Sequence, residues 1–198
     1  MLERLGEDEL RKAVVSYRDL LRAHREYLNR LNVYPVPDGD TGTNMALTLD
    51  SVVAELDGVS GMAATCKAIG HGSLMGARGN SGVILSQILR GLTDVLRDVD
   101  AADAKTLAEG LTHASDTAYQ AVMRPVEGTI LTVAREAAEA GATCSMNCLA
   151  EVLDAAAGAA RAALDRTPEL LPVLAEAGVV DAGAAGYVLL FDALLFVV

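Results

Sequence analysis

Apolar residues recur at helical spacing along most of the chain. Between residues 7 and 31 they fall every three or four positions, with charged residues on the opposite face. This pattern is typical of a long amphipathic helix. Similar spacing predicts four further helices, over residues 44–56, 61–76, 83–96 and 103–123.

The second half of the chain continues the helical pattern. A sixth helix follows the turn at 124–129 and ends near Gly141, and an alanine-rich helix covers residues 145–164. Thr167 and Pro168 are expected to cap a short helix that ends at Gly178, and the last helix opens at residues 181–186. Since no segment shows the alternation of a β-strand, the pattern predicts about eight helices and no sheet.

Composition supports a single helical domain and excludes some partners. Hydrophobic residues make up 52% of the 198 residues and aromatic residues only 4%, which favours packed helices. A chain of this length can bury a substantial core as one domain. The net charge of −11 argues against nucleic acid or an anionic membrane as a partner, because binding to either relies on basic clusters.

The chain ends and the cysteines bear on location. The first residues lack the basic and apolar regions of a signal peptide. Cys144 and Cys148 are expected to share a helix face and, like Cys66, to be buried thiols rather than zinc ligands. We therefore expect a cytoplasmic protein. The apolar run from 183 to 198 is expected to be a buried helix rather than a transmembrane segment. Its lack of a C-cap predicts that residues 1–198 were cut from a longer protein.

The segment 32–44 concentrates the polar chemistry. Asp38 and Asp40 flank Gly39, so a turn can bring both carboxylates to one face, which suits Mg²⁺ and its preference for oxygen ligands. A surface turn with an N-cap is the simpler alternative. Gly42, Thr43 and Leu49 break the pattern of an EF-hand. The prolines before Asp38 disfavour the buried strand of a haloacid-dehalogenase-type phosphatase.

Four glycine-rich segments share one arrangement. Each precedes a predicted helix and carries Asp, Asn, Ser or Thr, at residues 38–44, 76–82, 127–129 and 181–186. In an antiparallel bundle such turns can gather at one end, where helix N-termini bind anions. For each turn taken alone, the need of a helix for a cap is the better explanation, and it is their joint occurrence that favours a common site.

These segments resemble a known family. The sequences NVYPVPDGDTGTNM at 32–45, GARGNSGVILSQ at 76–87, VEGTIL at 126–131 and DAGAAG at 181–186 are similar to the ATP-binding domain of bacterial fatty acid kinase, a relative of the dihydroxyacetone kinase L subunit. The resemblance spans nearly the whole chain and implies an all-α, eight-helix antiparallel barrel. Its loops at one end would hold ATP and two Mg²⁺ ions, in agreement with the absence of a Walker loop from the sequence.

The resemblance also implies residue roles. Asp38 and Asp40 correspond to the metal ligands at the centre of catalysis, and Asn32 stands where the dihydroxyacetone branch has a third carboxylate. Phosphate contacts are implied for Thr41, Thr43, Asn44, Gly79, Asn80, Ser81 and Gly82. The adenine side of the pocket is implied for Gly128, Thr129 and Ile130, and its closure for Asp181 and Gly183.

Two further residues have open roles. Arg78 lies in the second glycine-rich turn, where it either pairs with a phosphate or forms a surface salt bridge. We expect His71 to have a core or substrate-contact role rather than a catalytic one, because no neighbouring residue in the sequence orients it.

The implied activity is phosphoryl transfer from ATP to a fatty acid on a separate carrier protein, which gives an acyl phosphate. Further domains would complete the enzyme and carry any homodimer contact, so we expect the isolated chain to bind nucleotide with little or no activity. Two alternatives stay open, a phosphotransferase like the dihydroxyacetone kinase L subunit and a helical module that binds nucleotide or lipid without turnover. Asn32 and Thr41 weigh against the first of these.

Overall fold

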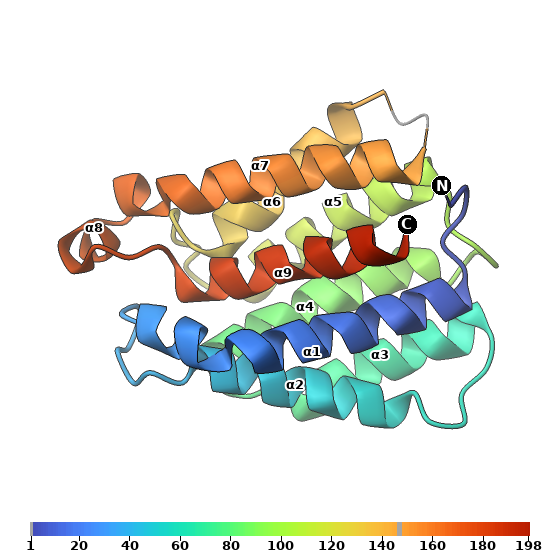
Figure 1. The fold of residues 1–198 in the computed structure, drawn as a ribbon, viewed down its shortest axis with the longest axis horizontal. Helices are drawn as coiled ribbons and strands as arrows, with labels where there is room; N and C mark the ends of the chain where they lie inside the picture. The colour runs from blue at the N-terminus through green and yellow to red at the C-terminus, as the bar shows by residue number, and fades with distance from the viewer. Residues whose placement is uncertain (1, 146–147) are drawn as a thin grey trace.

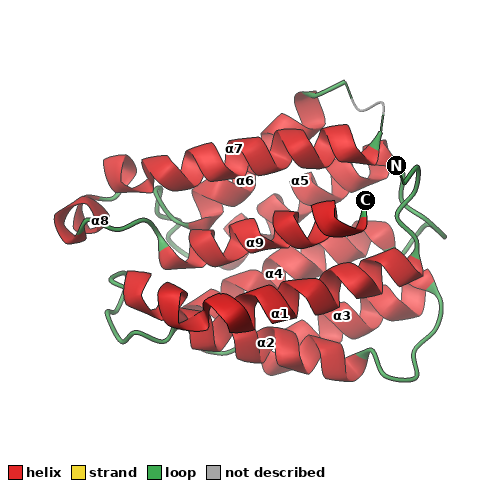
Figure 2. Cartoon of the chain, viewed as in Figure 1, coloured by secondary structure: helices red, strands yellow, loops and turns green. Residues whose placement is uncertain are grey.

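The computed structural model describes residues 2–145 and 148–198, and in this part of the chain helices are joined by loops (Figure 2). No β-strand occurs among these residues beyond an isolated bridge between Leu5 and Ala102. The helices are α1 (Glu7–Leu31), α2 (Thr41–Glu55), α3 (Met62–Gly76), α4 (Gly79–Leu96), α5 (Ala104–Ala121), α6 (Ile130–Thr143), α7 (Leu149–Leu170), α8 (Pro172–Ala177) and α9 (Ala182–Val197).

The eight longer helices form a closed antiparallel ring. Each packs against the next in the chain from α1 to α7, and α9 packs against both α7 and α1 (Figure 1). The short α8 lies beyond the end of α7 and outside this ring. The predicted all-α, eight-helix antiparallel barrel is confirmed.

The direction of the helices gathers half of the connections at one end. The α1–α2, α3–α4 and α5–α6 loops lie there, together with α8 and the start of α9, while both termini lie at the opposite end (Figure 1). We call this the loop end. It contains all four glycine-rich segments.

The ring is closed by tight packing between α1, α2 and α9. Tyr17 is fully buried on α1, and its hydroxyl donates a hydrogen bond to the carbonyl oxygen of Gly186 on α9, at 3.0 Å. A side chain at residue 186 would meet the sulfur of Met45 on α2 at 2.6 Å. A buried hydroxyl needs a hydrogen-bond partner, so this contact fixes the position of α9 against α1.

The end of α7 corrects one prediction. Thr167 and Pro168 do not cap a short helix but lie inside the last turns of α7, and the short helix begins only at Pro172. Pro168 has no N–H for the carbonyl oxygen four residues earlier. The hydroxyl of Thr167 donates to that oxygen, on Leu164, at 2.8 Å, so the helix continues through the proline.

Two helices begin earlier than predicted. The second starts at Thr41 rather than Asn44, and the fourth at Gly79 rather than Val83. Glycine-rich sequence normally ends a helix, but here Gly42 and Gly82 lie where neighbouring helices leave no room for a Cβ atom. Tertiary packing therefore overrides low helix propensity.

The prediction for two cysteines is wrong. Cys144 follows the end of α6 and Cys148 precedes the start of α7, so they do not share a helix, and both are partly exposed. Cys66 is buried as predicted. The predicted helix over 145–164 begins at Leu149, and residues 146–147 within it lie outside the described chain.

The apolar C-terminal segment forms α9, and most of its residues are buried in the core, as predicted. Its Asp192 pairs with Arg161 of α7 at the surface. Within the described residues, every helix is either too short or too polar to span a bilayer.

The close crossing of α1 and α2 gives a test of the packing. A Cβ atom at residue 42 would lie 2.3 Å from the carbonyl oxygen of Arg25 and 2.8 Å from the Cβ of Leu28. We expect Gly42→Ala to lower the free energy of unfolding by about 1–3 kcal/mol, as overpacking does in other cores. Urea denaturation followed by circular dichroism measures this change.

Gly158 is the matched control. It is exposed on α7, and no atom lies within 4 Å of a Cβ built there. Gly158→Ala should raise the free energy of unfolding by about 0.5–1 kcal/mol, because glycine is a poor helix former. Equal effects of the two substitutions would contradict the packing argument.

Candidate functional site

A cavity of about 530 Å³ opens at the loop end, between the starts of four helices. Its lining comes from residues within 32–41, 79–84 and 121–131, together with Asp181 and Gly183. The structure therefore brings together residues from all four glycine-rich segments, although these are up to about 140 positions apart in the sequence.

The first wall of the cavity carries the two predicted metal ligands. Asp38 is exposed and Asp40 partly exposed, and both line the cavity. Gly39 between them has a φ of 68°, a left-handed conformation that glycine adopts without steric cost. The turn thus presents two carboxylates to one space.

Asn32 organises this loop through its buried amide. Its Oδ1 accepts hydrogen bonds from the backbone N–H groups of Asp40 and Thr41, at 3.1 and 3.3 Å. Its Nδ2 donates to the carbonyl oxygen of Val36 at 3.0 Å. An amide oxygen has two lone pairs, and both are occupied here, so the structure gives Asn32 a positioning role while its role as a metal ligand stays a prediction.

The second wall is the N-terminus of α4. Gly79, Asn80 and Ser81 line the cavity, and within the described chain their backbone N–H groups have no hydrogen-bond acceptor. Arg78, the N-cap residue, makes no side-chain cap. Three free N–H groups at the positive end of a helix dipole are well suited to an anion.

Some predicted contact residues lie behind the cavity wall. The hydroxyl of Thr43 accepts from Nδ2 of Asn29, and its N–H donates to Oδ1 of the same residue, both at 3.0 Å. Asn44 is buried beneath Gly79, and a Cβ atom at residue 79 would meet its Nδ2 at 2.3 Å. These two residues support the walls from behind, and a direct phosphate contact for them stays a prediction.

Two predicted glycines also serve packing. A Cβ atom at Gly82 would lie 2.6 Å from the hydroxyl of Thr48 on α2, and one at Gly128 would lie 2.9 Å from the carbonyl oxygen of Thr167 on α7. Neither glycine lines the cavity. By contrast, Thr41, Thr129, Ile130 and Gly183 are all part of its lining.

The N-termini of α6 and α9 are joined by one buried carboxylate. Oδ2 of Asp181, the N-cap residue of α9, accepts hydrogen bonds from the N–H of Ala184 at 2.8 Å and the N–H of Ile130 at 3.1 Å. The backbone N–H of Asp181 donates to the hydroxyl of Thr167 at 3.1 Å. Asp181 therefore ties three helices together at the cavity.

Burial changes the acidity of this carboxyl group. Asp181 is only 6% exposed, and desolvation raises its pKa to about 6, although the two N–H groups act in the opposite direction. Loss of hydration disfavours the charged form, whereas hydrogen bonds to the carboxylate favour it. Desolvation is the larger effect here.

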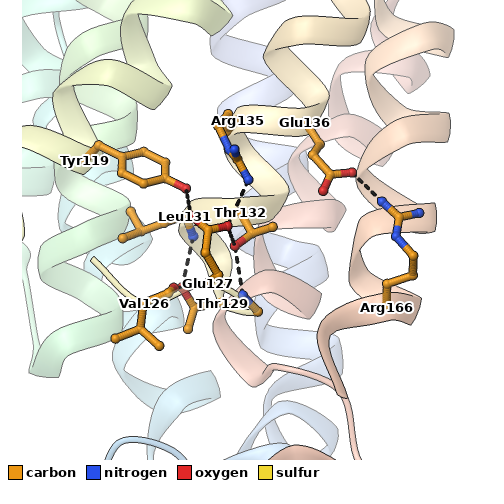
Figure 3. A network of polar contacts seen from close by, with 10 residues as sticks. Tyr119, Val126, Glu127, Thr129, Leu131, Thr132, Arg135, Glu136 and Arg166 are labelled. Carbon is orange, nitrogen blue, oxygen red and sulfur yellow. Dashed lines mark hydrogen bonds and ion pairs between the residues drawn. The ribbon is translucent and has the colours of Figure 1, made fainter. Parts of the chain in front are cut away.

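A polar network holds the third turn in place (Figure 3). Glu127 accepts hydrogen bonds from the hydroxyls of Tyr119 and Thr132, at 3.1 and 2.8 Å, and forms an ion pair with Arg135. The hydroxyl of Thr129 donates to the carbonyl oxygen of Val126 at 2.8 Å. The network fixes the residues of the 126–131 motif that line the cavity.

The lining also includes apolar residues to which the sequence analysis gave no role. Six of them lie inside the quoted motifs and two just before the third motif, namely Pro35, Val36, Val83, Ile84, Val126, Leu131, Ala121 and Val122. Val36 and Val83 are more than 45% exposed. The sequence alone does not distinguish an apolar residue that lines a cavity from one that packs in the core.

Arg124 and Tyr34 complete the lining and were also missed. Arg124 is the positively charged residue among the described residues that face the cavity, and it forms no ion pair or hydrogen bond with them. The other charged residues of the lining are Asp38, Asp40 and Asp181. The cavity therefore has a single cation with its donors free.

The two residues with open roles lie outside the cavity. His71 is exposed and faces Glu55, with 3.4 Å between Nδ1 and Oε2, so the expected core role is wrong. Arg78 donates to the carbonyl oxygens of Met75 and Ala77 at the end of α3, at 3.4 and 3.0 Å. Neither residue lines the site in this structure.

The described residues contain no cluster of three or more His, Cys, Asp or Glu side chains that could enclose a metal ion. The cavity offers the pair Asp38 and Asp40. This suits Mg²⁺ better than a fully protein-bound metal, because Mg²⁺ commonly takes one or two carboxylates and completes its shell with water and substrate phosphate.

The fold and cavity define an all-α domain with carboxylates and free helix N-termini at one end. The family model of the DAK2 domain matches residues 35–196, and the chain belongs to this family. An uncharacterized protein of Staphylococcus saprophyticus is 47% identical over 180 residues, which cover 88% of this chain and 32% of that protein. An uncharacterized protein of Staphylococcus aureus is 44% identical over 180 residues, with 88% and 33% covered.

Solved structures show the same fold. The dihydroxyacetone kinase of C. freundii in complex with AMP-PNP and Mg²⁺ matches with a TM-score of 0.71 at 22% identity, over 99% of this chain and 35% of that chain. Its native form matches with a TM-score of 0.70 at 24% identity, with the same coverage. The chain thus spans about a third of the length of the proteins it matches.

The raised pKa of Asp181 predicts how pH affects stability. The folded chain binds this proton more tightly than the unfolded chain, whose Asp has a pKa of about 3.9, so burial of the carboxylate lowers stability as pH rises from about 4 to about 6. Asp181→Asn keeps an acceptor for the two N–H groups and removes the titration. Between pH 4 and pH 6, we expect the free energy of unfolding of the variant to rise by about 2–3 kcal/mol relative to that of the wild type.

Urea denaturation of both proteins between pH 4 and 7 measures this difference. The comparison with the variant cancels the titration of the other acidic groups. A difference that stays constant with pH would contradict the effect of burial on Asp181.

Proposed function

We propose that this chain is the nucleotide-binding domain of a kinase that transfers a phosphoryl group from ATP to a carrier-bound fatty acid. The product is an acyl phosphate. Membership of the DAK2 family supports the kinase class, as does the fold shared with a kinase crystallised with AMP-PNP and Mg²⁺. The fatty acid acceptor rests on the resemblance of the four sequence motifs.

The main support for a nucleotide site is the presence of two kinds of groups in one cavity. Asp38 and Asp40 provide anionic oxygens, and Gly79, Asn80 and Ser81 provide unpaired N–H groups. A triphosphate with bound metal needs both kinds, because the ion requires oxygen ligands and the phosphates require donors. The apolar residues of the lining fit a purine base.

The residues of the cavity fit Mg²⁺ in chemistry and in accessibility. Asp38 and Asp40 would hold two ions together with phosphate oxygens. When bound, Mg²⁺ neutralises charge on the phosphates and helps to align them. Asn32 keeps the loop in shape by occupying the N–H groups of Asp40 and Thr41.

The chain contributes to phosphoryl transfer mainly through position and charge. The free N–H groups of α4 orient the phosphates and stabilise their charge without reorganisation, which is the main requirement of this reaction. Arg124 is placed at the same cavity and can add a positive charge. A carboxylate acceptor is already ionised near pH 7, so the domain needs no strong general base.

In this proposal the acceptor site lies outside the domain described here. The chain spans about a third of its relatives, which leaves ample length for domains that bind a fatty-acid carrier. The isolated domain would then bind nucleotide and show little transfer. Dihydroxyacetone, the substrate named for the matched kinase, is the alternative acceptor.

The metal loop gives the first test of the proposed site. Titration calorimetry of this chain with AMP-PNP should show binding that requires Mg²⁺. We expect Asp38→Ala and Asp40→Ala each to weaken this binding at least about 10-fold, since each removes a charged ligand. Circular dichroism should stay unchanged, because Asp38 is exposed and Asp40 partly exposed.

Asp57→Ala is the control for these substitutions. Asp57 is also an exposed Asp before a glycine, but its turn lies at the other end of the barrel, between α2 and α3. Its substitution should leave the affinity within about 2-fold. Unchanged affinity in both loop variants would refute the site.

The acceptor is tested on the complete protein. With Mg-ATP, hydroxylamine trapping should detect an acyl phosphate when a fatty-acid-loaded carrier is present, and ADP release should depend on that carrier. Dihydroxyacetone should support no ADP release. Turnover with dihydroxyacetone alone would replace the fatty acid, and nucleotide binding without turnover on any acceptor would favour a binding module.

A further inference from the structure

The last turns of α1 project from the ring of helices at the loop end. Residues 22–27 are six consecutive exposed residues, the longest such run in any described helix. Six consecutive residues of an α-helix point in every direction around its axis. Neighbouring helices therefore leave the side chains of this stretch uncovered on all sides. We call residues 22–30 the projecting end of α1.

The packing of α1 explains why this stretch is uncovered. Gly186, one turn into α9, already lies against Tyr17 and Leu21, so the last turns of α1 extend past the start of α9 (Figure 1). On the other side, Gly42 of α2 lies close to the carbonyl oxygen of Arg25. Because α2 meets the backbone of α1 there, the surrounding side chains stay accessible.

The projecting end of α1 is basic, although the chain as a whole has a net charge of −11. It contains Arg22, Arg25 and Arg30, and its only acidic residue is Glu26. Arg22 pairs with Asp50 of α2 and Arg25 pairs with Glu26, both at 2.8 Å, and both arginine side chains are more than half exposed. Arg30 forms no ion pair or hydrogen bond with the described residues. Exposed pairs contribute little to stability, so all three arginines are available to a partner.

The same surface has an aromatic residue and adjoins the cavity. Tyr27 is 49% exposed, and Arg and Tyr are enriched where proteins bind one another. α1 ends at Leu31 and leads directly into the loop of Asp38 and Asp40. In this loop Val36 is 55% exposed and lines the cavity. A partner on the projecting end of α1 would therefore stand beside the cavity.

The chemistry of this surface favours an acidic protein that binds transiently. A permanently attached domain usually covers a more apolar face. An anionic membrane needs a larger basic cluster or a helix with a broad apolar face. The net negative charge of the domain repels an acidic protein, whereas the projecting end of α1 attracts it, so charge orients the approach.

We propose that the projecting end of α1 is a docking surface for an acidic face of the carrier protein that delivers the acceptor. This inference rests on the proposed function, because transfer to a carrier-bound acceptor requires a second protein at the cavity. Docking here places the carrier next to the loop of Asp38 and Asp40. The exposed arginines act mainly on the rate of association and on its dependence on salt.

The test uses the complete protein, Mg-ATP and the fatty-acid-loaded carrier. The double variant Arg25→Glu, Arg30→Glu should raise KM for the carrier about 10-fold and leave kcat and the KM for ATP nearly unchanged, since repulsion slows docking without touching the reacting groups. The wild-type KM for the carrier should rise with ionic strength, because salt screens the attraction. In the variant this rise should be absent.

The double variant Arg90→Glu, Arg97→Glu is the matched control. Both arginines are more than half exposed on the second half of α4 or just after it, away from the loop end, and both pair with Asp94. The control changes the net charge by the same amount, and it should leave KM for the carrier within about 2-fold of wild type. Equal values of KM in wild type and in the α1 variant, or equal rises in both variants, would overturn the inference.

Two further measurements separate the remaining outcomes. The α1 variant of the isolated domain should bind Mg-AMP-PNP like wild type, which shows that its fold and nucleotide site are intact. Binding of the wild-type domain to phosphatidylglycerol vesicles that is lost in the α1 variant would assign the surface to lipid and overturn the inference. Failure of the complete wild-type protein to use the carrier at all would overturn the proposed acceptor as well.

Discussion

The unpaired N–H groups at helix starts are the constraint on which this structure depends. Each helix leaves such groups without partners inside the helix, and the alternating ring brings four helix starts to one end. The helix starts differ in whether these groups have a partner among the described residues. Asn32 and Asp181 occupy N–H groups at the starts of α2, α6 and α9, whereas the first three of α4 stay free. The free start therefore becomes the natural place for an anion from outside.

The three carboxylates of the cavity differ in their accessibility. Two accessible carboxylates stand on the loop after α1, and one buried carboxylate stands at the start of α9. The accessible pair can meet a cation, because it keeps water and has no internal partner. The buried one, Asp181, accepts hydrogen bonds from two backbone N–H groups, and its burial raises its pKa to about 6. Residues of one type thus have different chemistry because their burial differs.

Small residues make this arrangement compact. Gly42, Gly82 and Gly186 lie where a Cβ atom would overlap a neighbouring helix, which lets α1, α2, α4 and α9 approach closely. The hydroxyl of Tyr17 and the carbonyl of Gly186 then close the ring with a buried hydrogen bond. Glycine in a helix lowers intrinsic stability, and here the tight packing offsets that loss. The position of the cavity walls follows from these contacts.

The sequence by itself determined the helices, their approximate ends and the four motifs, because hydrophobic spacing and turn residues are local signals. It also singled out Asp38, Asp40 and Asp181. Only the tertiary structure decided that Asn32 binds the loop before α2, and that Thr43 and Gly82 face neighbouring helices. It also decided that His71 is exposed, and that Arg124 and several apolar residues line the cavity. The same holds for Pro168, which a neighbouring threonine keeps inside α7. These outcomes depend on the direction of a side chain relative to other helices, and contacts between residues far apart in the chain set that direction.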